Sequence, residues 1–198
     1  MDSRLQSGVS GIMFRLVMFK HDLGDGAQLR MLELRHAQTF LEFIEANRDH
    51  LGVFLEWGKT ITTLEQAEGF IKRGIARYAE DALPWVGIWL EERMVGGLLF
   101  FPLDRRVNAT EIGYWLGADV TGRGLMGKAI KAMLEFVFEE SKLNRLVLHA
   151  DVRNQASRAV AERLGFKLEG IERQSWLLHG EYTDNALYAM LAEDWRNK

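Results

Sequence analysis

The sequence predicts an α+β fold in which helices flank a mixed, mainly antiparallel central sheet. Two amphipathic helical patterns come first, strand patterns with short connections follow, and a strand–helix–strand unit comes after a glycine cluster. A regular doubly wound fold is not expected, because the strands before the glycine cluster follow one another without intervening helices. The 198 residues, of which 47% are hydrophobic, fit a single domain with one substantial core.

The first part of the chain predicts two helices that each bury one face. One is expected from Arg35, and the second near Thr62, where Thr62 and Glu65 have the spacing of a capping box. Pro84 ends the second pattern. The apolar positions at helical spacing are Ala37, Phe40, Leu41 and Ile44 in the first helix and Ala67, Phe70, Ile71, Ile75 and Tyr78 in the second.

The middle of the chain predicts a hairpin and a third strand. Residues 85–90 and 94–101 read as strands joined by a tight turn at 91–93, and residues 110–116 as the next strand. The later elements alternate between helix and strand, and Gly165 suits the left-handed end of the second helix. We expect helices over 128–140 and 156–164, and strands over 146–150, 166–168, 172–178 and 185–191.

Composition excludes several classes of protein. The chain has no cysteine, so disulfides and thiolate metal sites are absent, and no paired histidine spacing suggests a metal. A net charge of −3 argues against nucleic acid as the main partner. No apolar stretch is long enough to span a bilayer, and no signal-peptide pattern is present. We therefore expect no membrane partner and a cytoplasmic protein. Residues 1–12 are expected to form a flexible tail, and residues 13–198 the domain.

A glycine cluster between a strand and a helix is the most informative segment. Backbone amides at such a helix start favour an anion, and glycines let a phosphate approach closely. The glycines fit the dinucleotide pattern G-x-G-x-x-G, but antiparallel strands precede them. A P-loop reading fails at Ala129, which replaces the hydroxyl that holds magnesium. A cradle for the pyrophosphate of coenzyme A and a turn without a ligand remain open. The cluster comprises Gly122, Arg123, Gly124, Leu125, Met126, Gly127 and Lys128.

Several motifs in order resemble the GNAT acetyltransferases, and within them the RimJ/RimL-type ribosomal-protein N-terminal acetyltransferases. They are E-I-G-Y-W-L-G at 111–117, the glycine cluster, N-Q-A-S at 154–157 and R-L-G-F at 163–166. The resemblance covers residues 110–195 well and the earlier helices more loosely. The family's cofactor motif Q/R-x-x-G-x-G/A falls on 121–126, where Thr121 and Met126 depart from it.

The resemblance implies a GNAT-type sheet, splayed at the cofactor site, and acetyl-coenzyme A as cosubstrate. The Leu116 amide would donate to the thioester oxygen, and the amides from Arg123 to Lys128 would hold the pyrophosphate. Asn154 would bind pantetheine, although an Asn there is equally suited to capping a helix. Ser157 would act as general acid toward the thiolate; otherwise it is a solvated serine at a helix start.

The general base is less defined. Relatives often carry a glutamate where this chain has Trp176, so that role does not transfer. Glu111 is the best substitute, acting through a water, and an exposed strand carboxylate is the competing interpretation. His149 is a second candidate because imidazole titrates near neutral pH. Trp57, Trp85, Trp89, Trp115 and Trp176 could line an acceptor pocket or lie in the core.

The function expected from these residues is transfer of an acetyl group to an amine, first of all the N-terminal α-amine of a protein or peptide such as a ribosomal protein. Acetylation of a small amine is an alternative. A catalytically silent module that binds coenzyme A is another, because the family glutamate is missing. A homodimer is possible, since homodimers are frequent among the relatives.

Overall fold

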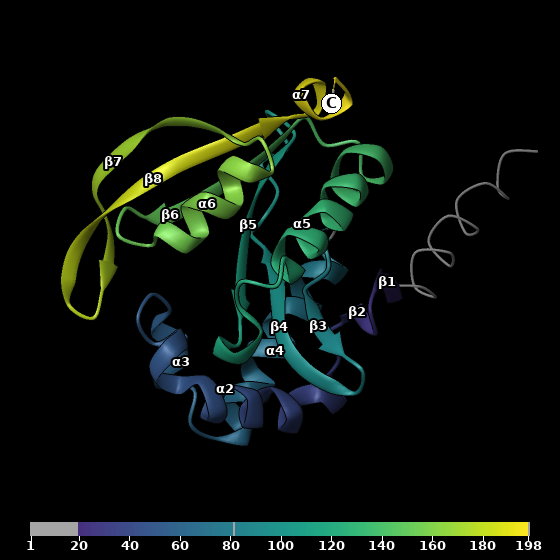
Figure 1. The fold of residues 1–198 in the computed structure, drawn as a ribbon, viewed down its shortest axis with the longest axis vertical. Helices are drawn as coiled ribbons and strands as arrows, with labels where there is room; N and C mark the ends of the chain where they lie inside the picture. The colour runs from purple at the N-terminus through teal and green to yellow at the C-terminus, as the bar shows by residue number, and fades with distance from the viewer. Residues whose placement is uncertain (1–19, 81, 198) are drawn as a thin grey trace, which may run out of the picture.

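The computed structural model describes residues 20–80 and 82–197, and it centres on a twisted eight-stranded sheet (Figure 1). The strand order is β1-β2-β3-β4-β5-β6-β8-β7. Every neighbouring pair is antiparallel except β5 and β6, which run parallel. The strands are β1 (Lys20–Gly24), β2 (Ala27–Met31), β3 (Val86–Leu90), β4 (Arg93–Phe100), β5 (Ala109–Leu116), β6 (Arg145–Asp151), β7 (Lys167–Leu178) and β8 (Glu181–Leu191).

Helices cover both faces of the sheet, as layered packing requires. The two long early helices pack on one face, and the helices after the glycine cluster pack on the other. The helical segments are η1 (Leu34–His36), α2 (Ala37–Leu51), α3 (Glu56–Thr60), α4 (Leu64–Ala79), η2 (Ala118–Val120), α5 (Leu125–Glu135), η3 (Phe136–Glu140), α6 (Gln155–Arg163) and α7 (Ala192–Arg196). We call the α2–α4 side the acceptor face and the other side the α6 face.

The acceptor face is packed largely by aromatic side chains. Phe40 of α2 and Phe70 of α4 meet with ring centroids 5.0 Å apart, and Trp115 of β5 joins both. Such offset and edge-on contacts add to the hydrophobic burial of each ring. On the α6 face, the apolar stripe of α5 closes a second cluster against the sheet. Its buried residues on α5 are Leu125, Met126, Ala129, Ile130, Met133 and Leu134.

The helix cap of α4 lies one residue later than the sequence suggested. Thr63, not Thr62, is the N-cap, and its side-chain oxygen accepts from the Gln66 amide. The Gln66 side chain in turn accepts from the Thr63 amide, which completes a capping box. The expected capping box of Thr62 with Glu65 was wrong. The pairs Thr62–Glu65 and Thr63–Gln66 have the same three-residue spacing, so the sequence pattern does not distinguish them.

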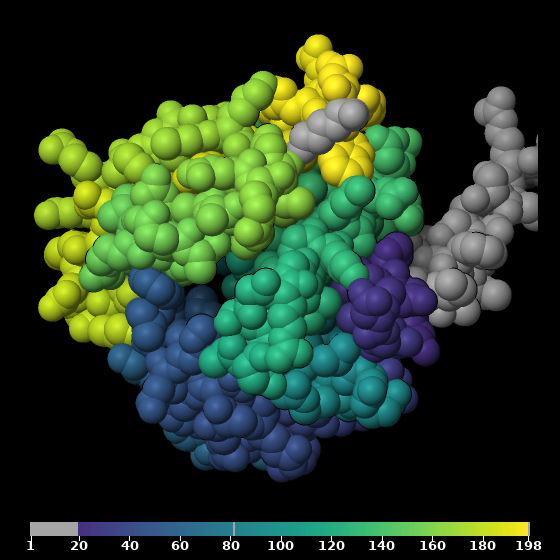
Figure 2. All heavy atoms as spheres, viewed as in Figure 1, coloured from purple at the N-terminus to yellow at the C-terminus, as the bar shows by residue number. Residues whose placement is uncertain are grey.

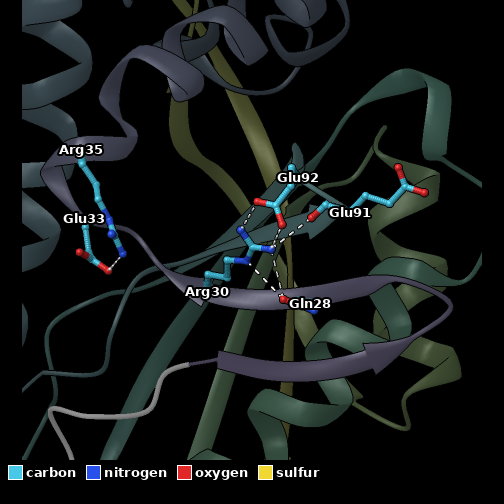
Figure 3. Close-up of polar contacts among 6 residues, drawn as sticks. All are labelled: Gln28, Arg30, Glu33, Arg35, Glu91 and Glu92. Carbon is cyan, nitrogen blue, oxygen red and sulfur yellow. Dashed lines mark hydrogen bonds and ion pairs between the residues drawn. The ribbon is translucent and has the colours of Figure 1, made fainter.

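The β3–β4 hairpin turns within two residues, Glu91 and Glu92, rather than the expected three. Glu91 takes a left-handed conformation there, with φ 55°. Arg30 of β2 fastens this turn: its guanidinium donates to both carboxylate oxygens of Glu92 at 2.9 Å and to the Glu91 carbonyl at 3.2 Å (Figure 3). The contact ties the second strand to the hairpin, but it lies at the surface and stabilises little.

The predicted fold class is confirmed: the sheet is mixed, mainly antiparallel and flanked by helices. The β1–β2 hairpin was not expected. Helix α5 begins at Leu125 instead of residue 128, and β7 is one strand, with two register shifts against β8, where two short strands were expected. The proposed tail, residues 1–12, lies outside the described residues. No helix in the described part of the chain is long and apolar enough to cross a membrane.

Candidate active site

Strands β5 and β6 diverge in the middle of the sheet. They pair only over Ala109–Arg145, Thr110–Leu146 and Glu111–Val147. Beyond Glu111, β5 stays with β4 as far as Leu116, while β6 stays with β8 as far as Asp151. The result is a V-shaped opening between two strands, which we call the splay.

Main-chain groups of β5 point into the splay. Val95 O accepts from Gly117 N at 2.8 Å, and Glu111 O accepts from Phe101 N at 3.0 Å. Because hydrogen-bonded pairs recur at every second residue of an antiparallel ladder, the odd-numbered residues of β5 bond to β4. The amides of Ile112, Tyr114 and Leu116 therefore face away from β4, toward the splay. An extended ligand could bond there as an added strand does.

The glycine cluster lies where the chain leaves β5 and enters α5. Gly124 is the N-cap of α5 with φ 75°, a left-handed conformation that suits glycine. The Lys128 amide donates to the Gly124 carbonyl at 3.1 Å, so the amides of Leu125, Met126 and Gly127 remain as first-turn donors.

Open space lies in front of these amides. A Cβ atom added at Gly122, Gly124 or Gly127 would meet nothing within 4 Å. The room, the free donors and the dipole of an eleven-residue helix together suit a pyrophosphate. The Lys128 ammonium lies 2.7 Å from the Asp25 carboxylate at the surface. It would have to leave that partner to contact a phosphate.

Asn154 caps helix α6, one of the two roles expected for it. Its Oδ1 accepts from the Ser157 amide at 3.1 Å. This bond uses the acceptor of the side-chain amide and leaves the role of its NH₂ group for the cofactor open. The cap also fixes Ser157 in the first turn of α6, where the helix dipole favours a developing negative charge.

The Ser157 hydroxyl is paired with a phenol that the sequence analysis left without a role. Tyr114 Oη lies 2.7 Å from Ser157 Oγ and 3.1 Å from the Ser157 carbonyl oxygen. Burial raises the pKa of Tyr114 to about 12, so the phenol stays protonated at neutral pH. Tyr114 is the fourth residue of the motif E-I-G-Y-W-L-G. Only the fold, which brings the first turn of α6 within hydrogen-bond distance of β5, reveals its partner.

The acceptor face carries a second polar group at the splay. Residues of a strand alternate between faces, so Glu111 lies on the same face as the buried Trp115 and opposite to Tyr114. Glu111 Oε1 lies 3.1 Å from His149 Nδ1, and Glu172 Oε2 lies 3.4 Å from His149 Nε2. The hydrogen bond to Glu111 and the charges of both glutamates raise the pKa of His149, although burial opposes them.

Glu111 and His149, the two bases proposed from the sequence, thus lie in one cluster. Glu172, which was not predicted, is its third member. The part of the chain that the structure describes holds no group of three His, Asp or Glu side chains arranged for a metal ion.

The tryptophans divide between core and surface. Trp85, Trp89 and Trp115 are buried, Trp57 is half-buried with its ring 5.2 Å from that of Trp115, and Trp176 is 53% exposed on β7. Only the last two therefore remain available to line an acceptor pocket.

The acceptor side of the splay is bounded by two segments distant in sequence. His179 Nε2, in the β7–β8 turn, donates to the Gly52 carbonyl at the end of α2, at 2.6 Å. Figure 2 shows the surface hollowed where the blue α3 region, the green start of α5 and the yellow-green α6 region meet. The opening therefore reaches the surface beside the glycine cluster.

Comparison with known proteins identifies relatives along most of the chain. The family model described as an acetyltransferase (GNAT) domain matches residues 27–167. YdaF of Bacillus subtilis (strain 168), provisionally named a ribosomal N-acetyltransferase, is 29% identical over 182 residues, which cover 91% of this chain and 100% of YdaF. The ribosomal-protein-serine acetyltransferase of Escherichia coli (strain K12) is 25% identical over 171 residues, covering 86% and 96%.

A solved structure agrees with these matches. RimL, a ribosomal L7/L12 α-N-protein acetyltransferase in complex with coenzyme A, superimposes with a TM-score of 0.83 at 27% identity. The superposition covers 88% of this chain and 99% of RimL.

Proposed function

The chain belongs to the GNAT acetyltransferase family and is an acetyl-coenzyme-A-dependent N-acetyltransferase, and we propose that its acceptor is the N-terminal α-amine of a protein or peptide. The observation that carries this proposal is the pair of polar groups on opposite faces of the splay. Ser157 with Tyr114 lies on the α6 face, and Glu111 with His149 lies on the acceptor face. An acyl transfer needs these two functions, protonation of the leaving thiolate and deprotonation of the amine, at the two sides of one carbonyl.

The residues present fit coenzyme A. The first-turn amides of α5 would hold the pyrophosphate, the amides of Tyr114 and Leu116 would bond the extended pantetheine, and Asn154 lies at the adjacent start of α6. Bound there, the cosubstrate supplies a thioester. Leu116 is the residue expected to donate to the thioester oxygen, which would stabilise negative charge on it in the transition state.

Ser157 is proposed to protonate the departing thiolate. Its hydroxyl can give its proton toward the splay if it accepts a hydrogen bond from the Tyr114 phenol, which stays neutral at neutral pH. The N-terminal end of α6 would stabilise the thiolate until that proton arrives.

The choice of an α-amine follows from basicity and from the relatives. An α-amine has an unperturbed pKa near 7.7–8.0, while a lysine amine is near 10.4. At neutral pH the α-amine is neutral far more often, so a base of moderate strength is sufficient. The relatives named above are described as acetyltransferases of ribosomal proteins, which supports a protein N-terminus over a small amine.

The test is acetylation of a peptide that offers both a free N-terminus and an internal lysine, followed by mass spectrometry. Spermidine and free amino acids serve as competing small amines. Modification of the N-terminus supports the proposal. A clear preference for a small amine would assign the alternative acceptor class, and coenzyme A binding without transfer to any amine would indicate a silent module.

A further inference from the structure

We propose that His149 is the group that takes the proton from the acceptor amine, with Glu111 positioning its imidazole and Glu172 stabilising the imidazolium that forms. This rests on the proposed function and deepens it: Glu111 acts through His149 instead of through a water. The three side chains come from β5, β6 and β7 and meet on the acceptor face.

The hydrogen-bonding geometry defines which nitrogen accepts. A neutral imidazole carries one N–H. Nδ1 lies 3.1 Å from Glu111 Oε1, the shorter of the two contacts, so we assign the single proton of the neutral ring to Nδ1, which donates to Glu111. Nε2 then holds a lone pair that faces Glu172 Oε2 at 3.4 Å. In the neutral ring, the Nε2 lone pair and the Glu172 carboxylate oxygen repel each other. When Nε2 takes up a proton, the imidazolium and Glu172 form an ion pair instead.

The position of His149 also suits the task. It lies two residues beyond Val147, the last residue of β6 that pairs with β5, and therefore within the splay. Its side chain is 26% exposed, so part of the imidazole is open to solvent in the splay. Glu111 is held by the paired part of the ladder and directs its carboxylate at the imidazole. A positioning role for Glu111 fits this arrangement.

The charges around His149 are of one sign. Its neighbours are Glu111 on β5 and Glu172 on β7, and β8 presents Leu187 directly opposite it. Arg145, the cation on the same face of β6, is bound to Glu169. The two carboxylates stabilise the imidazolium, and the pKa of His149 is accordingly raised, although burial opposes them. An imidazole is also closer in basicity to an α-amine than a carboxylate is.

The proton balance is complete. The acceptor arrives as an ammonium ion and gives one proton to Nε2, which leaves a neutral amine. The nitrogen then bonds to the acetyl carbon as the carbon–sulfur bond breaks. Ser157 protonates the thiolate, and the second proton lost from nitrogen replaces the one Ser157 gave. His149 releases its proton to water, so the reaction yields an amide, a thiol and one proton.

The test compares the pH dependence of kcat for the wild type with His149→Gln, Glu172→Gln and Glu135→Gln, using any amine the enzyme acetylates. The wild type should lose activity on the acidic side at a pKa above 6.5, because a protonated His149 cannot accept. Glu172→Gln should move this limb to lower pH, because the imidazolium loses one stabilising carboxylate. His149→Gln should remove the part of the limb that His149 contributes, leaving that of the amine, and should lower kcat by about 100-fold or more.

The acceptor's own ionisation is common to all variants, so it cannot produce these differences. Glu135→Gln is the control: it removes an exposed carboxylate of α5, which packs on the opposite face of the sheet, and it should leave the limb in place. A His149→Gln enzyme with the wild-type profile would refute the relay while leaving acetyl transfer intact. The proposed function would fail separately, through a wild type that acetylates no peptide.

A second measurement needs no variant to fold. Titration of the His149 ring by NMR in the wild type should give a pKa above 6.5 and the Nδ1–H tautomer at high pH. A pKa below 6.5, or the Nε2–H tautomer, would overturn the proposal.

Discussion

The Tyr114 hydroxyl lies 2.7 Å from Ser157 Oγ and joins β5, where it leaves β6, to the first turn of α6. Tyr114 lies on β5, one of the two strands that form the splay, and Ser157 lies on the helix that follows β6, the other strand. Their contact therefore connects the geometry of the splay to the orientation of a hydroxyl.

Replacing Tyr114 by Phe should lower kcat by about fivefold, because a hydrogen bond of this kind contributes about 1 kcal/mol. The KM for acetyl-coenzyme A should stay the same, since the phenol orients Ser157 and the backbone amides hold the cofactor. Steady-state kinetics separates the two parameters. Tyr182→Phe, which removes an exposed hydroxyl, is the control. Equal kcat values for both variants would leave the Tyr114 contact a packing feature only.

Ser157→Ala should lower turnover by about 100-fold or more with little change in the affinity for coenzyme A. The fold should be unaffected, because Asn154 caps α6 through the backbone amide of Ser157, which alanine retains. Asn154→Ala is the contrasting variant, and its loss of the cap should cost about 1 kcal/mol in unfolding free energy. Thermal unfolding and a thiol-release assay measure both quantities. Undiminished turnover in Ser157→Ala would remove the residue from the chemistry.

Gly127→Ala should stabilise the protein and yet weaken coenzyme A binding. Alanine in place of a helical glycine raises the free energy of unfolding by about 0.5–1 kcal/mol. The new Cβ would meet no protein atom within 4 Å. Because Cβ atoms of a helix lean toward its N-terminus, this one would enter the space assigned to the pyrophosphate.

The matched control is Gly69→Ala in α4, where a Cβ also has open space. It should be stabilised to the same degree and bind coenzyme A normally. Isothermal calorimetry on both variants decides the question. Normal affinity in Gly127→Ala would place the phosphates elsewhere.

The sequence predicted the elements that bear strong local signals. The helix after the glycine cluster could be anticipated because glycines precede a clear apolar stripe, although it starts three residues earlier than expected. The strand 110–116 could be anticipated because it lies between loop and turn residues. The β1–β2 hairpin could not, since β1 buries none of its residues and so shows no apolar alternation. The cap of α4 was displaced by one residue because neighbouring residues satisfy the same pattern.

The site was predictable only in part. Ser157, Glu111 and the glycine cluster came from a family resemblance, and the local sequence supports each. Glu172 could not be found in this way, because it reaches His149 across β8 and the register of β7 is interrupted between Leu168 and Gly170 and between Glu172 and Trp176. The alternation of residues along β7 therefore does not predict that Glu172 contacts His149. Trp176, at the position of the family glutamate, is exposed, and the acid stands four residues earlier on the same strand.

The measurement that tests the central claim most directly is mass spectrometry of a peptide carrying a free N-terminal serine and one internal lysine, after incubation with the enzyme and acetyl-coenzyme A at pH 7. We predict one acetyl group on the α-amine, with the lysine essentially unmodified, because at this pH the α-amine is neutral over a hundredfold more often. Acetylation chiefly on the lysine side chain would contradict the account.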